Sequence, residues 1–88
     1  MFEFDINKSL SNKEKHGIDF DEAQALWDNN NAYEFKTQYL EEERFIVIGQ
    51  VKNKYWTAVI TYRNNNIRII SVRRSREKEI ESYENYYS

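Results

Sequence analysis

Three apolar, β-branched runs follow one another closely in the second half of the chain, and they constrain its fold more than any other feature. They read RFIVIGQV (44–51), KYWTAVITY (54–62) and IRIISVR (67–73). Runs of this kind are typical of strands, and the short asparagine-containing links between them favour hairpins. The sequence therefore predicts an antiparallel meander of three strands. Because both faces of the middle strand are largely apolar, other elements must cover at least part of each face.

Shorter patterns indicate the elements at the amino terminus. In MFEFD, Phe2 and Phe4 alternate with acids, which is the period of a short half-buried strand. A polar helix is predicted over residues 6–16, and Gly17 suits the left-handed conformation that ends such a helix. This part of the chain therefore predicts a strand followed by a helix.

Two further helices are predicted, one before and one after the meander. Over residues 19–28, Asp19 and Glu22 have the spacing of an acidic capping box. A variable stretch then leads to the meander, after which Ser75 opens a last helix over residues 75–87. The predicted order is β-α-α-β-β-β-α. This is an α+β fold with an antiparallel sheet, two amino-terminal helices and one carboxy-terminal helix.

Composition limits the organisation and the chemistry. The 88 residues, 40% of them hydrophobic, suffice for one compact core, so residues 1–88 are expected to form a single domain. The lack of cysteine excludes a disulfide framework, and a single histidine excludes the usual multi-histidine metal sites. We expect no metal and no cofactor, although a site of carboxylates alone stays open. No leader and no apolar run of about 18 residues is evident, which predicts a cytoplasmic protein without a membrane segment.

The net charge of −2 hides a basic segment late in the chain. Between residues 63 and 78, six cations stand against a single acid: Arg63, Arg68, Arg73, Arg74, Arg76 and Lys78. Arg73 and Arg74 come where the last strand gives way to a helix, whose free N–H groups favour anions. Two guanidinium groups beside such a helix would hold a phosphate. Equally, these arginines could keep a strand edge soluble and pair with nearby acids.

Alternation along the last strand predicts which of its side chains share a face. One face receives Ile67, Ile69, Ser71 and Arg73, and the other receives Arg68, Ile70, Val72 and Arg74. Arg73 is thus expected at an exposed strand end, where its removal should leave folding nearly intact.

The motif Lys15-His16-Gly17 has two interpretations. Basic residues and a left-handed glycine favour the end of a helix for structural reasons alone. A histidine also titrates near neutral pH and could transfer a proton. RNA can be cleaved without metal by attack of its own 2′-hydroxyl, given a base, an acid and cationic groups for the phosphate. The tyrosines of the last helix could stack on bases, although packing is their more common role.

Three ordered motifs carry a resemblance to a known family. FEFDINKSLSNKEKHGIDFDEA, EEERFIVIGQV and IRIISVRRSREKEIESYE follow one another along nearly the whole chain. Their most specific pieces are Asn12 with Lys15-His16-Gly17, Glu43-Arg44-Phe45 with Gly49, and Ile69-Ile70-Ser71 with Arg73. In this order the motifs resemble the BrnT family of bacterial type II toxins, with residues 1–88 as one toxin domain.

The resemblance implies a RelE-like ribonuclease fold and a toxin that inhibits translation by cutting RNA. It also implies neutralisation by a BrnA-like antitoxin, a ribbon-helix-helix DNA-binding protein. In that family the toxin–antitoxin complex binds its own promoter, so operator DNA would be contacted mainly through the antitoxin. The alternative function is a non-catalytic module that binds nucleic acid or a partner protein, such as a toxin homologue whose activity has decayed.

Several residues fall on the family's characteristic polar positions. Catalytic roles are assigned to Lys15, His16, Arg44, Arg73 and Tyr83, and RNA binding to Arg63, Arg68, Ser71 and Arg74. We hypothesise that Lys15 or His16 acts as the base or the acid. Arg44 and Arg73 would hold the phosphate, and Tyr83 would orient a base or give a proton. Tyr62 stands where the family often has an acid, so that acid has no counterpart at this position.

Overall fold

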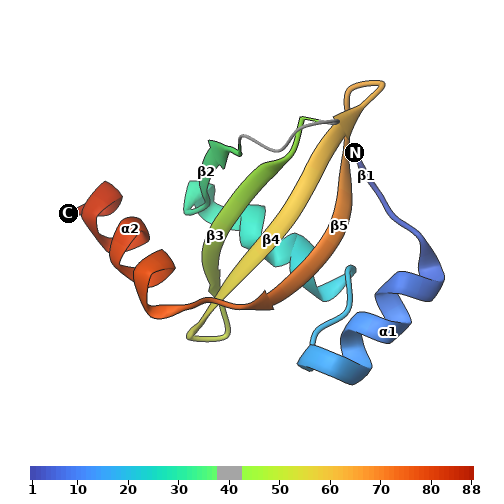
Figure 1. Ribbon diagram of the computed structural model, residues 1–88, viewed down its shortest axis with the longest axis horizontal. Coiled ribbons are helices and arrows are strands. Elements are labelled where there is room, and N and C mark those ends of the chain that lie inside the picture. Colours follow the sequence, from blue (N-terminus) through green and yellow to red (C-terminus); the bar gives the residue numbers. More distant parts are fainter. Residues whose placement is uncertain (38–42) are drawn as a thin grey trace.

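The computed structural model describes residues 1–37 and 43–88. Its elements are β1 (Phe2–Glu3), α1 (Ile6–His16), the 3₁₀ helix η1 (Glu22–Asn30), β2 (Tyr33–Lys36), β3 (Phe45–Val51), β4 (Lys54–Arg63), β5 (Asn66–Arg74) and α2 (Glu77–Tyr87). The five strands form one sheet in the order β1-β5-β4-β3-β2, with α1 and α2 at opposite sides of it (Figure 1). The predicted α+β class is confirmed.

The sheet is mixed, and this corrects the predicted antiparallel sheet. β3, β4 and β5 form the expected antiparallel meander, but β1 pairs with β5 in the parallel direction, with Phe2 opposite Ile67. The N–H of Ile67 also donates to the carbonyl of Met1 at 2.8 Å. β2 is an additional strand within the variable stretch, paired antiparallel with β3. The parallel pairing joins residues far apart in the sequence, such as Phe2 and Ile67, so no local pattern indicates its direction.

Both predicted hairpins are confirmed. Lys52 and Asn53 join β3 to β4 with φ of 52° and 66°, and Asn64 and Asn65 join β4 to β5 with φ of 53° and 68°. Two successive residues with positive φ are the conformation of a type I′ turn, which matches the twist of the flanking strands. Asparagine tolerates this conformation, which explains its presence in both links.

The predicted cap at Gly17 and the predicted hydrogen bonds between Asp19 and Glu22 are confirmed, but two helix starts differ from the prediction. The second helix is a 3₁₀ helix that begins at Glu22, not at Asp19, and the last helix begins at Glu77, not at Ser75. Gly17 ends α1 with φ of 83°, and its N–H donates to the carbonyl of Lys13 at 2.9 Å. Before η1, the N–H of Glu22 donates to the Asp19 carboxylate at 2.7 Å, and the N–H of Asp19 donates to the Glu22 carboxylate at 3.0 Å. These are the reciprocal bonds of a capping box. No helix among the described residues has the length and hydropathy needed to cross a membrane.

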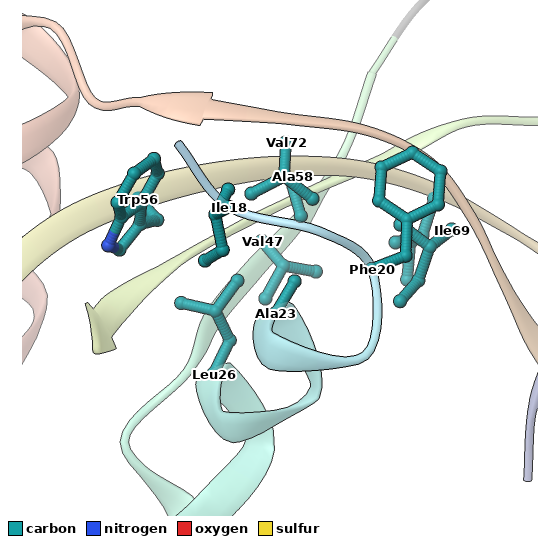
Figure 2. Packing of buried hydrophobic residues seen from close by; sticks show 10 residues of the cluster. Ile18, Phe20, Ala23, Leu26, Val47, Trp56, Ala58, Ile69 and Val72 are labelled. Carbon is teal, nitrogen blue, oxygen red and sulfur yellow. The ribbon is translucent and has the colours of Figure 1, made fainter. Parts of the chain in front are cut away.

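The hydrophobic core lies on one face of the sheet, here named the core face. There the segment leading into η1, and η1 itself, pack on the strands (Figure 2). The cluster contains Ile18, Phe20, Ala23, Leu26, Val47, Trp56, Ala58, Ile60, Ile69 and Val72. Gly49 lets η1 approach β3, because a Cβ at that position would lie 3.1 Å from Cδ2 of Leu26. The opposite face carries Thr57, and we name it the α2 face because α2 packs on it.

A β-bulge in β5 changes which side chains reach each face. Val59 pairs with Ser71 and Ile60 pairs with Ile69, so Ile70 has no opposite residue in β4. One extra residue reverses the alternation of side chains beyond it.

The predicted grouping of the β5 side chains is therefore wrong. Pairing with β4 assigns Ile67, Ile69, Val72 and Arg74 to the core face, and Arg68, Ser71 and Arg73 to the α2 face. Arg73 and Arg68 thus lie on the same face, whereas simple alternation had placed them on opposite faces.

A buried polar side chain attaches α1 to the outer edge of β5. Asn12 is 7% exposed, and its Nδ2 donates to the carbonyls of Val72 and Ile18, both at 2.8 Å. Its Oδ1 accepts the N–H of Val72 at 3.2 Å. β1 covers only the beginning of this edge, with its last pair at Arg68. Asn12 therefore takes the place of a neighbouring strand at Val72.

We expect Asn12→Ala to lower the free energy of unfolding by about 3 kcal/mol, because it leaves buried N–H and C=O groups without partners. Asn7→Ala, at an exposed position in the first turn of the same helix, is the matched control and should change it by less than about 0.5 kcal/mol. Urea unfolding followed by circular dichroism measures both. Equal effects of the two substitutions would contradict this role of Asn12.

Candidate functional site

An ion pair between Arg73 and Glu79 lies on the α2 face. Nη1 and Nη2 of Arg73 donate to the two carboxylate oxygens of Glu79 at 2.8 and 2.7 Å. The side chains are 29% and 20% exposed. The predicted exposed position of Arg73 is thus wrong, because its guanidinium is partly covered and joins the end of β5 to the first turn of α2. Removing it would leave a partly buried carboxylate without its counter-charge.

Glu79 accepts two further hydrogen bonds. The N–H of Arg76 donates to it at 2.7 Å and the hydroxyl of Thr57 at 3.1 Å. Burial by itself raises the pKa of Glu79, but the hydrogen bonds from Arg73 and Arg76 outweigh it, so this pKa is below its ordinary value. The hydrogen bond to Glu79 in turn raises the pKa of Arg73. Both groups are therefore charged at neutral pH.

One edge of the Arg73 guanidinium, here named the open edge, forms no hydrogen bond with the described residues. Glu79 occupies the Nη1–Nη2 end, and Nη1 also donates to the carbonyl of Arg74 at 3.2 Å. No described residue accepts a hydrogen bond from Nε–H or from the second N–H of Nη2. These two N–H groups point in the same direction from the planar group, which is a geometry that binds two oxygens of a phosphate. Arg73 can therefore hold Glu79 and an anion together.

Hydroxyl groups lie beside this pair. The hydroxyls of Thr57 and Ser75 are 2.7 Å apart, and the N–H of Ser75 donates to the carbonyl of Tyr55 at 3.0 Å. Ser71 is two positions before Arg73 on the same face. The neighbourhood of Arg73 on β4 and β5 is thus polar, whereas the same strands are apolar on the core face.

Tyr83 packs where α2 meets the sheet. It is 8% exposed, and its ring centroid lies 5.5 Å from that of Tyr55 and 4.8 Å from that of Tyr87. Tyr55 in turn donates its hydroxyl to Glu84 at 2.9 Å. The structure thus brings Tyr83 to the same face as Arg73, in a packing position, and its catalytic role stays a prediction.

Lys15 and His16 lie apart from the Arg73 site. Both are exposed on the last turn of α1, which runs along the outer edge of β5, whereas α2 is on the other side of the sheet (Figure 1). No described residue forms a hydrogen bond or an ion pair with either side chain. The capping role of Gly17 is established, and proton transfer by Lys15 or His16 stays a prediction.

Two other predicted residues have partners of their own. Arg68 is on the α2 face, with Nη1 3.4 Å from the carboxylate of Glu3. Arg44 directly precedes β3 and is half-buried, and its carbonyl accepts the N–H of Thr37 at 2.8 Å. Neither arginine forms a described contact with Arg73 or Glu79.

Arg63 and Arg74 lie away from the Arg73–Glu79 pair: Arg63 is at the far end of the sheet, and Arg74 is on the core face. Arg63 is exposed at the hairpin between β4 and β5. Beside it, Tyr62 donates its hydroxyl to both carboxylate oxygens of Glu34 at 2.8 and 2.7 Å, and burial together with this carboxylate raises the pKa of Tyr62 to about 12. Arg74 is on the core face, with Cζ 5.5 Å from the ring centroid of Trp56.

Glu79 and Thr57 were absent from the predicted site. A signal for Glu79 exists in the sequence, since it stands three residues after Arg76, the spacing at which a carboxylate reaches back to the start of a helix. Thr57 carries no such signal, because its position beside Glu79 depends on the strand register. Both belong to the site through their contacts with Arg73 and α2.

A comparison with protein-family models gives a match over residues 4–79. The matching model is described as "Ribonuclease toxin, BrnT, of type II toxin-antitoxin system". The matched range includes Lys15, His16, Arg73 and Glu79, and it ends before Tyr83. No match to a curated protein was found.

The lowered pKa of Glu79 predicts a pH-dependent effect of Glu79→Gln. A glutamate in the unfolded chain has a pKa of about 4.3, and the pKa of Glu79 is lower in the folded protein. The ionised carboxylate therefore stabilises the fold above about pH 4.3, and this stabilisation is lost as the pH falls through the pKa of the folded protein. The substitution should therefore destabilise the fold by about 1–2 kcal/mol at neutral pH, and by progressively less as the pH falls below about 4. Urea unfolding over a series of pH values from neutral downward tests this. Glu81→Gln, at an exposed position of α2, is the control, and an effect of Glu79→Gln independent of pH would refute the pairing.

Proposed function

Because the chain belongs to the BrnT family of ribonuclease toxins of type II toxin–antitoxin systems, we propose that it is a metal-independent endoribonuclease that cuts RNA and so inhibits translation. The observation that supports this most directly is the open Nε–Nη2 edge of Arg73, on a polar face and held in orientation by Glu79. Such an edge suits a phosphate whose negative charge increases in the transition state.

The proposed reaction uses the RNA's own nucleophile. The 2′-hydroxyl attacks the adjacent phosphorus while a base removes its proton, and the bond from phosphorus to the 5′-oxygen of the next nucleotide breaks as an acid protonates that oxygen. The products are a 2′,3′-cyclic phosphate and a 5′-hydroxyl. Arg73 would bind the non-bridging oxygens, where it stabilises the charge that develops during attack.

Glu79 would act as a positioning residue for Arg73. Its lowered pKa makes it a weak base, so proton transfer is better assigned elsewhere. Lys15 or His16 remains proposed as the base or the acid, which requires the RNA to reach around the end of β5 toward α1. Arg44 and Tyr83 remain proposed as auxiliary catalytic residues.

RNA binding is proposed for a wider set of residues. Arg68 and Ser71 share the face of Arg73, so a strand of RNA could follow β5 across them. Arg74 would bind at the opposite face and Arg63 at the hairpin. Such contacts to phosphates add affinity without sequence preference.

Membership of a type II toxin–antitoxin family implies an antitoxin partner. We propose that this partner is a BrnA-like ribbon-helix-helix protein and that operator DNA is bound only through the complex. A second candidate function is binding without catalysis. It is favoured by one observation, that no described contact joins Lys15 or His16 to the Arg73 pair.

Arg73→Ala should reduce the rate of cleavage of a single-stranded RNA by at least about 100-fold, the loss typical of removing one transition-state donor. Arg63→Ala is the matched control, because it removes the same charge at the hairpin between β4 and β5. It should reduce the cleavage rate by less than about tenfold. Purified proteins are assayed on end-labelled RNA, and induced expression is tested for growth arrest.

Folding must be checked for these variants, because Arg73→Ala leaves Glu79 without its counter-charge. Arg73→Lys keeps the charge but loses the planar fork, so a folded Arg73→Lys protein with a large loss of rate supports phosphate binding by the guanidinium. Cleavage by Arg73→Ala at the wild-type rate would refute the role of Arg73. RNA binding without cleavage by the wild type would favour the non-catalytic module.

A further inference from the structure

A pocket of about 340 Å³ lies where the connection from α1 to η1 meets the β3–β4 hairpin. Its apolar lining consists of Ala25 and Val51, which are partly exposed, and of Ile18 and Trp56, which are 3% and 7% exposed and form its floor. Trp56 is on the core face, so the pocket is on the opposite side of the sheet from Arg73. Its volume is in the lower part of the range of small-molecule sites, which combine apolar walls with a few polar groups.

Lysines surround this apolar lining. Lys13, Lys52 and Lys54 line the pocket together with one acid, Glu22. Nζ of Lys13 lies 2.7 Å from Oε1 of Glu22, and this hydrogen bond is the main cause that lowers the pKa of Glu22. These two charges offset each other. Lys52 and Lys54 form no ion pair within residues 1–37 and 43–88, so the pocket keeps an excess of positive charge that attracts an anion.

The pocket also reaches the Lys15-His16-Gly17 motif. Gly17 is one of its lining residues, and a Cβ added there would meet no atom within 4 Å. The space beside Gly17 is therefore open. Lys15 and His16 directly precede it and are exposed. The motif thus borders a cavity in addition to ending a helix.

The end of β5 joins this pocket to the Arg73 site. Arg73 pairs with Thr57 and Arg74 with Trp56, so the two successive arginines point to opposite faces. The guanidinium of Arg74 lies 5.5 Å from the ring centroid of Trp56, which lines the pocket. A strand of RNA held at Arg73 and passing around this end of the sheet would meet Arg74 and then the lysines.

We propose that the pocket binds a nucleotide flanking the scissile phosphate, with its base against Ala25 and Val51 and its phosphate beside Lys52 and Lys54; this rests on the ribonuclease function proposed above. A nucleotide uses both parts of the pocket, because each base has a flat apolar face and each nucleotide carries a phosphate. An acidic peptide would satisfy the lysines but leave the apolar walls without a partner.

Nuclear magnetic resonance titrations test the pocket directly. The four ribonucleoside 5′-monophosphates, inorganic phosphate, adenosine and a hexaglutamate peptide are each added to the labelled full chain, and the indole N–H of Trp56 and the amide of Gly17 are followed. At least one monophosphate should shift both signals and bind more tightly than phosphate or adenosine alone. Lys54→Glu should weaken that binding by at least about tenfold. Lys8→Glu makes the same charge change at an exposed position of α1 and should alter it by less than about twofold.

Cleavage assays separate this proposal from the proposed function. In an active enzyme, Lys54→Glu should raise KM for an RNA oligonucleotide at least about tenfold and change kcat little. A chain that cleaves RNA but shows no monophosphate binding at Trp56 and Gly17 overturns the pocket alone. A chain that binds monophosphates there but never cleaves RNA supports a nucleotide site and overturns the ribonuclease function. Tighter binding of hexaglutamate than of every monophosphate overturns the proposal in favour of an acidic protein segment.

Discussion

The hydrogen bonds between the Asn12 side chain and the backbone of Val72 determine how the amino-terminal half of the chain meets the sheet. β1 covers only the beginning of the outer edge of β5, so the N–H and C=O of Val72 need another partner. An amide offers a donor and an acceptor together, and Asn12 satisfies both. Its third bond, to the carbonyl of Ile18, fixes the chain just after Gly17. Asn12 thereby helps to fix the position of α1, the entry of Ile18 into the core and the pocket beside Gly17, together with the buried Ser9, whose hydroxyl accepts the N–H of Phe20 at 2.9 Å.

The bulge next to this contact determines what each face of the sheet can bind. If Ile70 were paired with β4 in a regular strand, alternation would have directed Arg73 toward the core face and Arg74 toward α2. With the bulge, Arg73 reaches Thr57 and Glu79, while Arg74 covers Trp56. Bulges commonly redirect side chains in this way near functional sites. The chain thus presents successive arginines to two different surfaces at one end of the sheet.

Sequence chemistry predicted the features that depend on near neighbours. The left-handed helix end at Gly17 and the hairpin turn at Asn53 are each determined by the conformational preference of one or two residues. The bulge was not predicted, because Ile70 is as typical of a strand as the residues beside it and only pairing with β4 reveals that it is extra. The candidate site has the same limit. Arg73 was predicted from its local motif, whereas its partner Glu79 lies six positions away, across a turn whose geometry only the folded chain fixes.

The distribution of ion pairs indicates where a polyanion would be attracted. Arg73 and Arg68, on the α2 face, are each paired with a glutamate, which offsets their positive charge. Lys52, Lys54 and Arg74, around the pocket, form no ion pair in the described part of the chain. Affinity for a polyanion increases with the number of cations that neutralise its phosphates. Under the proposed ribonuclease function, a chain with a net charge of −2 would therefore gain RNA affinity mainly at the pocket, while Arg73 would act on the phosphate that reacts.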